Sequence, residues 1–187
     1  ELLTENILDI VNQLNMGVQL LKSQAEKYDL AQLNLIAGRK AKAAAAYEAA
    51  LKYLTIGLEL IETDSWESNY NLTFNLYLET TEVEYLNSNF EYSKELGNIS
   101  LQQANSILEQ VKIYKIKILS CIAQNQMLEA LDLGVKVLNI LGVRLPNKPK
   151  LQHLLLELFR TKIILTGKKI QDLAYLPNMT DPYKLAA

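Results

Sequence analysis

The chain has 187 residues, 19 of them basic and 21 acidic, which gives a formal net charge of −2. Binding to nucleic-acid phosphates needs a clear basic excess, so this balance argues against a nucleic-acid partner. Apolar residues make up 49% with only seven Gly and four Pro, as packed helices require. No apolar run approaches the ~20 residues that cross a bilayer, so we expect no membrane span. The single cysteine, Cys121, has no partner for an internal disulfide, which favours a reducing, cytoplasmic compartment.

Apolar residues recur at helical spacing along nearly the whole chain, and polar or glycine-containing turns interrupt them. We therefore predict an all-α protein, a single helical-repeat domain over 1–187 with eight or nine helices and a break at 142–149. An alternating stretch at 112–118 is the nearest approach to a strand, but a helix cap precedes it and a helical pattern follows it. The expected helices span roughly 4–21, 24–37, 40–61, 65–86, 90–103, 106–124, a seventh segment ending at 142, 150–166 and a short stretch after 167 that reaches 175.

Residues that favour helix N-termini stand before several of these segments. The clearest are Ser106 and Asp64, each with a Glu three residues later, which is the spacing of a capping box. Thr4 is a candidate cap for the first helix, and Asp181 for a last helix that Pro182 opens. A helix of one turn is not stable by itself, so we expect the natural protein to continue past Ala187.

Small residues recur at fixed distances after three expected hairpin turns, near Gly38, Ser88 and Asn125. Small side chains on the second helix of a hairpin let neighbouring helices approach closely, so the spacing predicts antiparallel hairpins stacked as a short solenoid. The pattern resembles the tetratricopeptide repeat, although the turns lie 50 and 37 residues apart rather than about 34. A generic amphipathic bundle rich in alanine is the alternative. The expected packing residues are Gly38, Ala43, Tyr47, Ala50, Ser88, Phe90, Ser93, Gly97, Asn125, Met127, Ala130 and Gly134.

Four strings stand in a fixed order along the chain: LNLIAGRKAKAAAAYEAALKYL, SWESNYNLTFNLYLETTEVEYLNSNF, KIKILSCIAQNQMLEALDLGVKVLNILGVRLP and LPNMTDPYKLAA. Together they resemble the helical region of cyanobacterial multi-sensor signal transduction multi-kinases. In that family a serine/threonine kinase domain, an ATPase module, a sensor domain and a histidine kinase share one chain. The resemblance implies a helical regulatory module between catalytic domains. It transfers no catalytic residue, so it implies that kinase activity belongs to the parent protein.

The residues compose no catalytic, cofactor or metal site. His153 stands just inside a helix, where a surface role is the preferred interpretation over a phosphoacceptor. One His and one Cys far apart in sequence form neither a zinc site nor a nucleophile pair. The densest carboxylates are Glu79, Glu82 and Glu84, and the first two share a helix face. They could hold a cation or do acid–base work, but a solvated or groove-facing acidic strip is the preferred interpretation.

Two basic clusters and a row of tyrosines complete the candidates. The basic clusters could receive a phosphate or an acidic peptide, with charged, solvated loops as the preferred interpretation. Tyrosines at intervals of seven or eight residues indicate a packing stripe, although tyrosine also lines recognition grooves. We place the candidate partner groove at Tyr77, Glu82 and Tyr85, on the helix over 65–86. The basic clusters are Arg39, Lys40 and Lys42, and Lys112, Lys115 and Lys117; the tyrosines are Tyr70, Tyr77, Tyr85 and Tyr92.

Together these features predict a protein-interaction and signal-coupling module that has no catalysis of its own and uses no cofactor. Its expected partner is a protein or peptide, including flanking domains of the same chain. A structural spacer between catalytic domains and a stand-alone helical adaptor are the alternatives. Exposed repeat ends also make self-association, for example as a homodimer, a candidate, and the sequence leaves the oligomeric state open.

Overall fold

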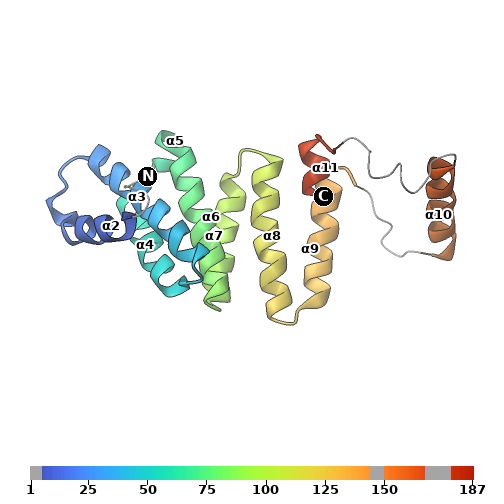
Figure 1. The fold of residues 1–187 in the computed structure, drawn as a ribbon, viewed down its shortest axis with the longest axis horizontal. Coiled ribbons are helices and arrows are strands. Elements are labelled where there is room, and N and C mark those ends of the chain that lie inside the picture. Colours follow the sequence, from blue (N-terminus) through green and yellow to red (C-terminus); the bar gives the residue numbers. More distant parts are fainter. Residues whose placement is uncertain (1–5, 144–149, 167–177) are drawn as a thin grey trace. The chain divides into compact units, whose positions relative to one another are not determined.

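The structure, a computed structural model, describes residues 6–143, 150–166 and 178–187, and its secondary structure in these ranges is helical throughout (Figure 1). The predicted all-α class is therefore confirmed, and the alternating stretch at 112–118 lies inside a helix. By its internal contacts the chain divides into two units, Glu1–Leu133 and Gly134–Ala187, and we describe each by itself. The expected single domain over 1–187 stays a prediction.

Among the described residues, three pairs of helices are each joined by a turn of three residues. These pairs are α3 (Gln24–Ala43) and α4 (Tyr47–Leu60), α6 (Tyr70–Leu86) and α7 (Phe90–Gln103), and α8 (Ile107–Ala123) and α9 (Met127–Ile140). The other elements are α2 (Ile7–Met16), η1 (Val18–Leu20), α5 (Ser65–Ser68), α10 (Leu151–Leu165) and α11 (Pro182–Ala186).

Gly38, expected at the first hairpin turn, lies inside α3, so that prediction is wrong. The helix runs on to Ala43, and the turn stands at Ala45, whose φ is 57°. Alanine is the strongest helix former, and the alanine-rich stretch that follows Gly38 carries the helix across the glycine. Gly38 serves packing instead, because a Cβ there would lie 2.7 Å from Cγ of Leu54 on α4. The helix expected over 40–61 accordingly begins at Tyr47.

The three turns share one hydrogen-bond pattern. Their central residues, Ala45, Ser88 and Asn125, adopt left-handed backbone angles with φ of 57°, 64° and 60°. In each turn the next amide donates to the carbonyl five residues earlier, at 2.8–2.9 Å, which is the closing bond of a Schellman motif. Gly142 closes α9 in the same way with φ of 84°, as expected for a helix-stopping glycine. One local device thus ends α3, α6, α8 and α9.

When the first turn is placed at Ala45, the small residues of the second helices lie at equivalent positions in the first two hairpins. Ala50 and Ser93 stand five residues after their turns, Gly57 and Ser100 twelve residues after, and all four are buried. A Cβ on Gly57 would lie 2.6 Å from Cδ2 of Leu76 on α6, so the missing side chain lets the hairpins meet. The packing positions of the first hairpin are Ala50, Leu54 and Gly57, in place of the expected Ala43, Tyr47 and Ala50.

The corner positions two residues after each turn carry Tyr47, Phe90 and Met127. The first two are half-buried, whereas 54% of Met127 is exposed, so this side chain does not fill the corner. Of the other expected packing residues, Gly97 and Ala130 are buried, Gly134 is half-buried and Ala43 is exposed.

In the first unit, the first helix of each later hairpin packs against both helices of the hairpin before it. α6 contacts both α3 and α4, and α8 contacts both α6 and α7. Val11, Leu54 and Leu76 belong to one apolar core that runs from α2 to α6, and none of them is accessible to solvent. Ile113 on α8 is also fully buried and lies close to Gly97 of α7. The core therefore extends from one hairpin to the next along the chain.

Ser106 begins α8 with the predicted capping box. Its hydroxyl accepts from the amide of Glu109 at 3.2 Å, and the Glu109 carboxylate accepts from the amide of Ser106 at 3.2 Å. Asp181 caps α11 as predicted, by accepting from the amide of Tyr183 at 2.9 Å. Both caps can be predicted from the sequence because every bonding partner lies within three residues of the capping residue. Thr4 and the short stretch expected to end at 175 lie outside the described residues.

The capping box expected at Asp64 is wrong, because the Asp64 side chain makes no cap bond. α5 is a single turn, and Asn69, with φ of −144° and ψ of 53°, breaks the helix before α6 begins. A capping box that the sequence analysis missed opens α3 instead, where Ser23 and Glu26 bond reciprocally. These bonds lower the pKa of the exposed Glu26 carboxyl.

Replacing Ala45 with Gly is expected to stabilise the protein by about 0.5–1 kcal/mol, because a left-handed residue with a Cβ is strained and glycine is not. The matched change Ala43→Gly, two residues earlier and still helical, is expected to destabilise it by up to about 1 kcal/mol. Urea unfolding of both variants measures the two signs. Loss of stability in Ala45→Gly would contradict the placement of the turn.

Candidate functional site

A cluster of polar side chains on the first unit joins α3 to α6. Residues 39 and 42 lie on one face of α3, and residues 75, 79 and 82 lie on one face of α6. Arg39 Nε lies 2.7 Å from Oε1 of Glu79, while Lys42 Nζ lies 2.5 Å from Oε2 of Glu79 and 2.6 Å from Oε2 of Glu82. Arg39 Nη2 also donates to Oδ1 of Asn75 at 2.6 Å. We call these five residues the charge network.

The charge network unites two features that the sequence analysis treats as separate. The acidic strip on α6 and the basic cluster on α3 are partners, so Glu79 and Glu82 already hold an intramolecular cation. Side-chain exposure is 22% for Lys42 and 12% for Glu79. Burial pulls the pKa of Lys42 down, but its hydrogen bonds and charge interactions with Glu79 and Glu82 outweigh burial, so the pKa is raised. The ammonium therefore stays charged throughout the neutral range.

Glu84, the third residue of the acidic strip, lies outside the network. It is buried, and its carboxylate accepts from Nδ2 of Asn89 at 2.7 Å. Among the described residues no group of three or more His, Cys, Asp or Glu side chains is arranged to hold a metal ion.

The residues of the predicted partner groove all lie on α6 and are partly buried. Glu82 and Tyr85 are three residues apart and share a face, whereas Tyr77 and Glu82 are about 140° apart around the helix. The Tyr77 ring packs against Trp66 with centroids 4.9 Å apart. Burial, with a smaller contribution from the nearby Tyr92, raises the pKa of Tyr77. A groove at these residues stays a prediction, with Tyr85 and Glu82 as its natural centre.

Tyr70 ties the start of α6 to the connection between α7 and α8. Its hydroxyl lies 2.8 Å from Oε2 of Glu109 and 3.1 Å from the carbonyl of Gln103, and it accepts from the amide of Asn105 at 3.0 Å. Burial, then the hydrogen bond to Glu109, raises the pKa of Tyr70. Glu109 thus both caps α8 and anchors α6. The sequence offers no signal for the second role, because the two residues lie 39 positions apart.

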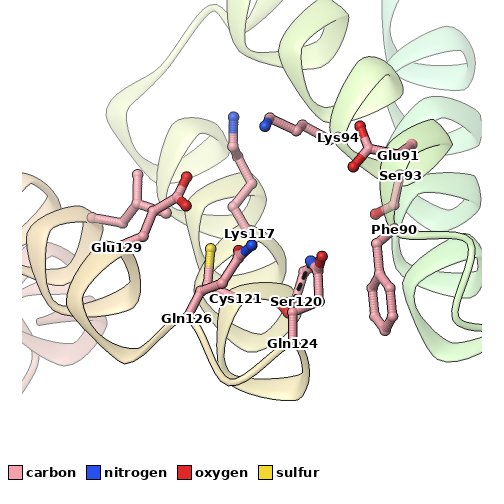
Figure 2. Close-up of a pocket in the computed structure, with 11 residues that line it drawn as sticks. Phe90, Glu91, Ser93, Lys94, Lys117, Ser120, Cys121, Gln124, Gln126 and Glu129 are labelled. Atoms are coloured by element: carbon pink, nitrogen blue, oxygen red, sulfur yellow. Dashed lines mark hydrogen bonds between the residues drawn. The ribbon is translucent and has the colours of Figure 1, made fainter.

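A small cavity of about 110 Å³, lined by both polar and apolar side chains, lies between α7, α8 and the first turns of α9 (Figure 2). Figure 2 shows Glu91 and Lys94 on the α7 side of the cavity and Lys117 and Cys121 on the α8 side. Burial raises the pKa of the Cys121 thiol, and the nearby Glu129 raises it further, so the thiol stays protonated at neutral pH. A protonated thiol is a poor nucleophile. The lining residues are Phe90, Glu91, Ser93, Lys94, Lys117, Ser120, Cys121, Gln124, Gln126, Glu129 and Leu133.

His153, in the second unit, has a local structural role. Its Nδ1 accepts from the backbone amide of Lys150, the N-cap residue of α10, at 3.1 Å. The ring is exposed, in line with the preferred interpretation of a surface histidine. In the part of the chain that the structure describes, no helix is long and apolar enough to cross a membrane.

Comparison with known proteins identifies a segment of a signalling kinase that is similar in sequence to this chain. No protein-family model matches the chain, and no solved structure matches it. The hybrid signal transduction histidine kinase G of Dictyostelium discoideum is 27% identical over 177 residues, which cover 90% of this chain and 5% of that protein. The chain thus spans a small part of the relative's length. This relative supports a histidine kinase context and does not test the cyanobacterial or the tetratricopeptide resemblance.

Replacing Lys42 with Met leaves Glu79 and Glu82 facing each other without their shared cation, and is expected to destabilise the protein by about 1–3 kcal/mol at pH 7. Because the pKa of Lys42 is raised on folding, its contribution is fully present below its ordinary pKa of about 10.4 and is lost as the pH rises through the raised value. Urea unfolding between pH 7 and pH 12 measures the difference from wild type.

The matched variant Lys115→Met, at an exposed position on α8, is expected to change stability by less than about 0.5 kcal/mol at every pH. A loss of stability in Lys42→Met, relative to wild type, that does not shrink above about pH 10.4 would argue against the network.

Proposed function

We propose that this chain is a non-catalytic protein-interaction and signal-coupling module within a large multidomain signalling kinase. The observation that carries the proposal is the match to the hybrid histidine kinase, which takes in 90% of this chain but only 5% of the relative. A segment of this kind in a long signalling chain joins other parts of the chain. The serine/threonine and histidine kinase activities are assigned to the parent protein, and the free thiol of Cys121 suits a cytoplasmic setting.

The helical hairpins support an interaction role of the tetratricopeptide type. A small residue stands five positions after each of the three turns and twelve positions after the first two, and the hairpins of the first unit contact their neighbours. Stacked hairpins of this kind offer an extended surface to a partner. They also provide contiguous packed contacts along which a displacement at one end can bias the other.

The partner surface that we propose lies on α6 around Tyr85 and Glu82. Tyr85 is half-buried, which suits a side chain that contributes apolar area and a hydroxyl to a contact. Glu82 is held in place by Lys42, so a partner would meet a preorganised carboxylate. The partner is a protein or peptide, including a flanking domain of the same parent.

A photo-crosslinking amino acid in place of Tyr85, in the full-length parent, is expected to capture a flanking domain or partner protein. The same amino acid in place of Glu59, which is exposed on α4, is the matched control and is expected to capture much less. Mass spectrometry of the crosslinked peptides identifies the contacts. Crosslinks confined to the α4 position would refute the α6 surface.

A spacer role gives a different outcome. In that case Tyr85→Ala and Glu82→Lys leave signalling by the parent intact, whereas deletion of the α6–α7 hairpin abolishes it. The interaction proposal predicts that both surface variants reduce parent kinase signalling while the chain stays folded by circular dichroism.

A further inference from the structure

Three neighbouring hollows line the edge of the first unit where the hairpin turns lie. The largest, of about 760 Å³, lies between α4 and the α6–α7 turn; the next has about 470 Å³, and the third is the cavity of Figure 2. Asn89 lines the first two hollows, and Phe90, Glu91 and Gln124 line the second and third. Because they share lining residues, the hollows adjoin in one line, which we call the turn-edge groove.

The repeat places side-chain amides along the turn-edge groove. Asn87 and Asn89 flank the left-handed Ser88, and Gln124 and Gln126 flank the left-handed Asn125. Each pair faces the second helix of the hairpin before it, because the Asn pair lines a hollow with α4 and the Gln pair lines one with α7. The positions that flank Ala45 are alanines, so the row of amides begins at the second hairpin.

One of these amides lacks its hydrogen bond. Nδ2 of Asn87 is buried and has no partner among the described residues, although a buried amide donor is normally paired. Asn89 donates through Nδ2 to Glu84 at 2.7 Å, and its oxygen remains an acceptor. Gln124 makes only long bonds to Ser120, at 3.2 and 3.3 Å. The groove therefore offers both donors and acceptors to a ligand.

The ligand that matches a row of amides is a peptide main chain. Each residue of an extended segment presents one carbonyl acceptor and one amide donor, and a side-chain amide can satisfy either. A helical segment is excluded, because its main-chain groups are already paired internally. Adjacent helices are about 8–10 Å apart, so a groove across two hairpin steps has room for about six extended residues at roughly 3.3 Å each.

The charges of the groove narrow the class of ligand further. Both acidic and basic side chains line it, with Glu48 and Lys52 in the first hollow and Glu91 and Lys94 in the third. This mixture disfavours a phosphorylated or strongly charged segment. Leu51 and Ile56 give the α4 end an apolar wall.

We propose that the turn-edge groove binds an extended polypeptide segment of low net charge, whose main chain hydrogen-bonds to Asn87, Asn89, Gln124 and Gln126. An apolar side chain of the segment packs at Leu51 and Ile56. The inference rests on the proposed interaction function and places a second contact surface away from the α6 surface around Tyr85.

Selection of twelve-residue peptides from a display library against the whole 187-residue chain supplies the probe. Fluorescence anisotropy then measures the affinity of a selected peptide. Asn87→Leu and Gln126→Leu are each expected to weaken binding about tenfold, because each removes an amide that pairs with the main chain. Gln102→Leu, at an exposed amide on α7 outside the groove, is the matched control and is expected to change affinity less than twofold.

Gln126 is exposed, so Gln126→Leu tests the groove even if Asn87→Leu disturbs the end of α6; circular dichroism checks the folding of each variant. Selected peptides that bind Asn87→Leu and Gln126→Leu normally but lose affinity for Tyr85→Ala would overturn the groove and leave the proposed function standing. Selection of no peptide at all would also overturn the groove, while crosslinking in the parent remains a separate test of the proposed function.

Discussion

The close approach of helices where a side chain is missing is the constraint on which the rest of the first unit depends. Gly38 lets α4 approach α3, and Gly57 lets α6 approach α4, because in each case a Cβ would overlap a fully buried leucine. Leu54 and Leu76 fill the space that the glycines leave. One such pair of a large and an absent side chain therefore closes the first hairpin, and the other joins it to the second hairpin and sets the spacing between them.

That spacing explains how features far apart in sequence come together. Once α3 and α6 are neighbours, Arg39 and Lys42 reach Glu79 and Glu82. The common closing bond at each turn brings the flanking amides to equivalent places on successive hairpins. The charge network and the proposed turn-edge groove thus both depend on how the hairpins pack, the first between packed helices and the second at their ends.

The sequence predicts best what is decided locally. The limits of α7 and the box at Ser106 follow from residues only a few positions apart, and both agree with the structure. The turn predicted at Gly38 is wrong because the sequence does not distinguish a glycine that permits close helix packing from a glycine that ends a helix. Ala45 carries no signal for its left-handed conformation, which three-residue closure between two packed helices imposes. The pairing of Lys42 with Glu79 spans 37 residues and depends on the fold.

A signal-coupling role needs a chain of contacts that is stiff enough to transmit a change, and the glycine–leucine contacts are the stiffest candidates. A double-mutant cycle with Gly57→Ala and Leu76→Ala tests them most directly. We expect Gly57→Ala to lower the free energy of unfolding by about 1–3 kcal/mol and Leu76→Ala to lower it by about 2–5 kcal/mol. The loss in the double variant is expected to be smaller than the sum of the two by at least about 1 kcal/mol. Additive losses would contradict the claim that the missing side chain at Gly57 and the leucine opposite it set the spacing of the hairpins.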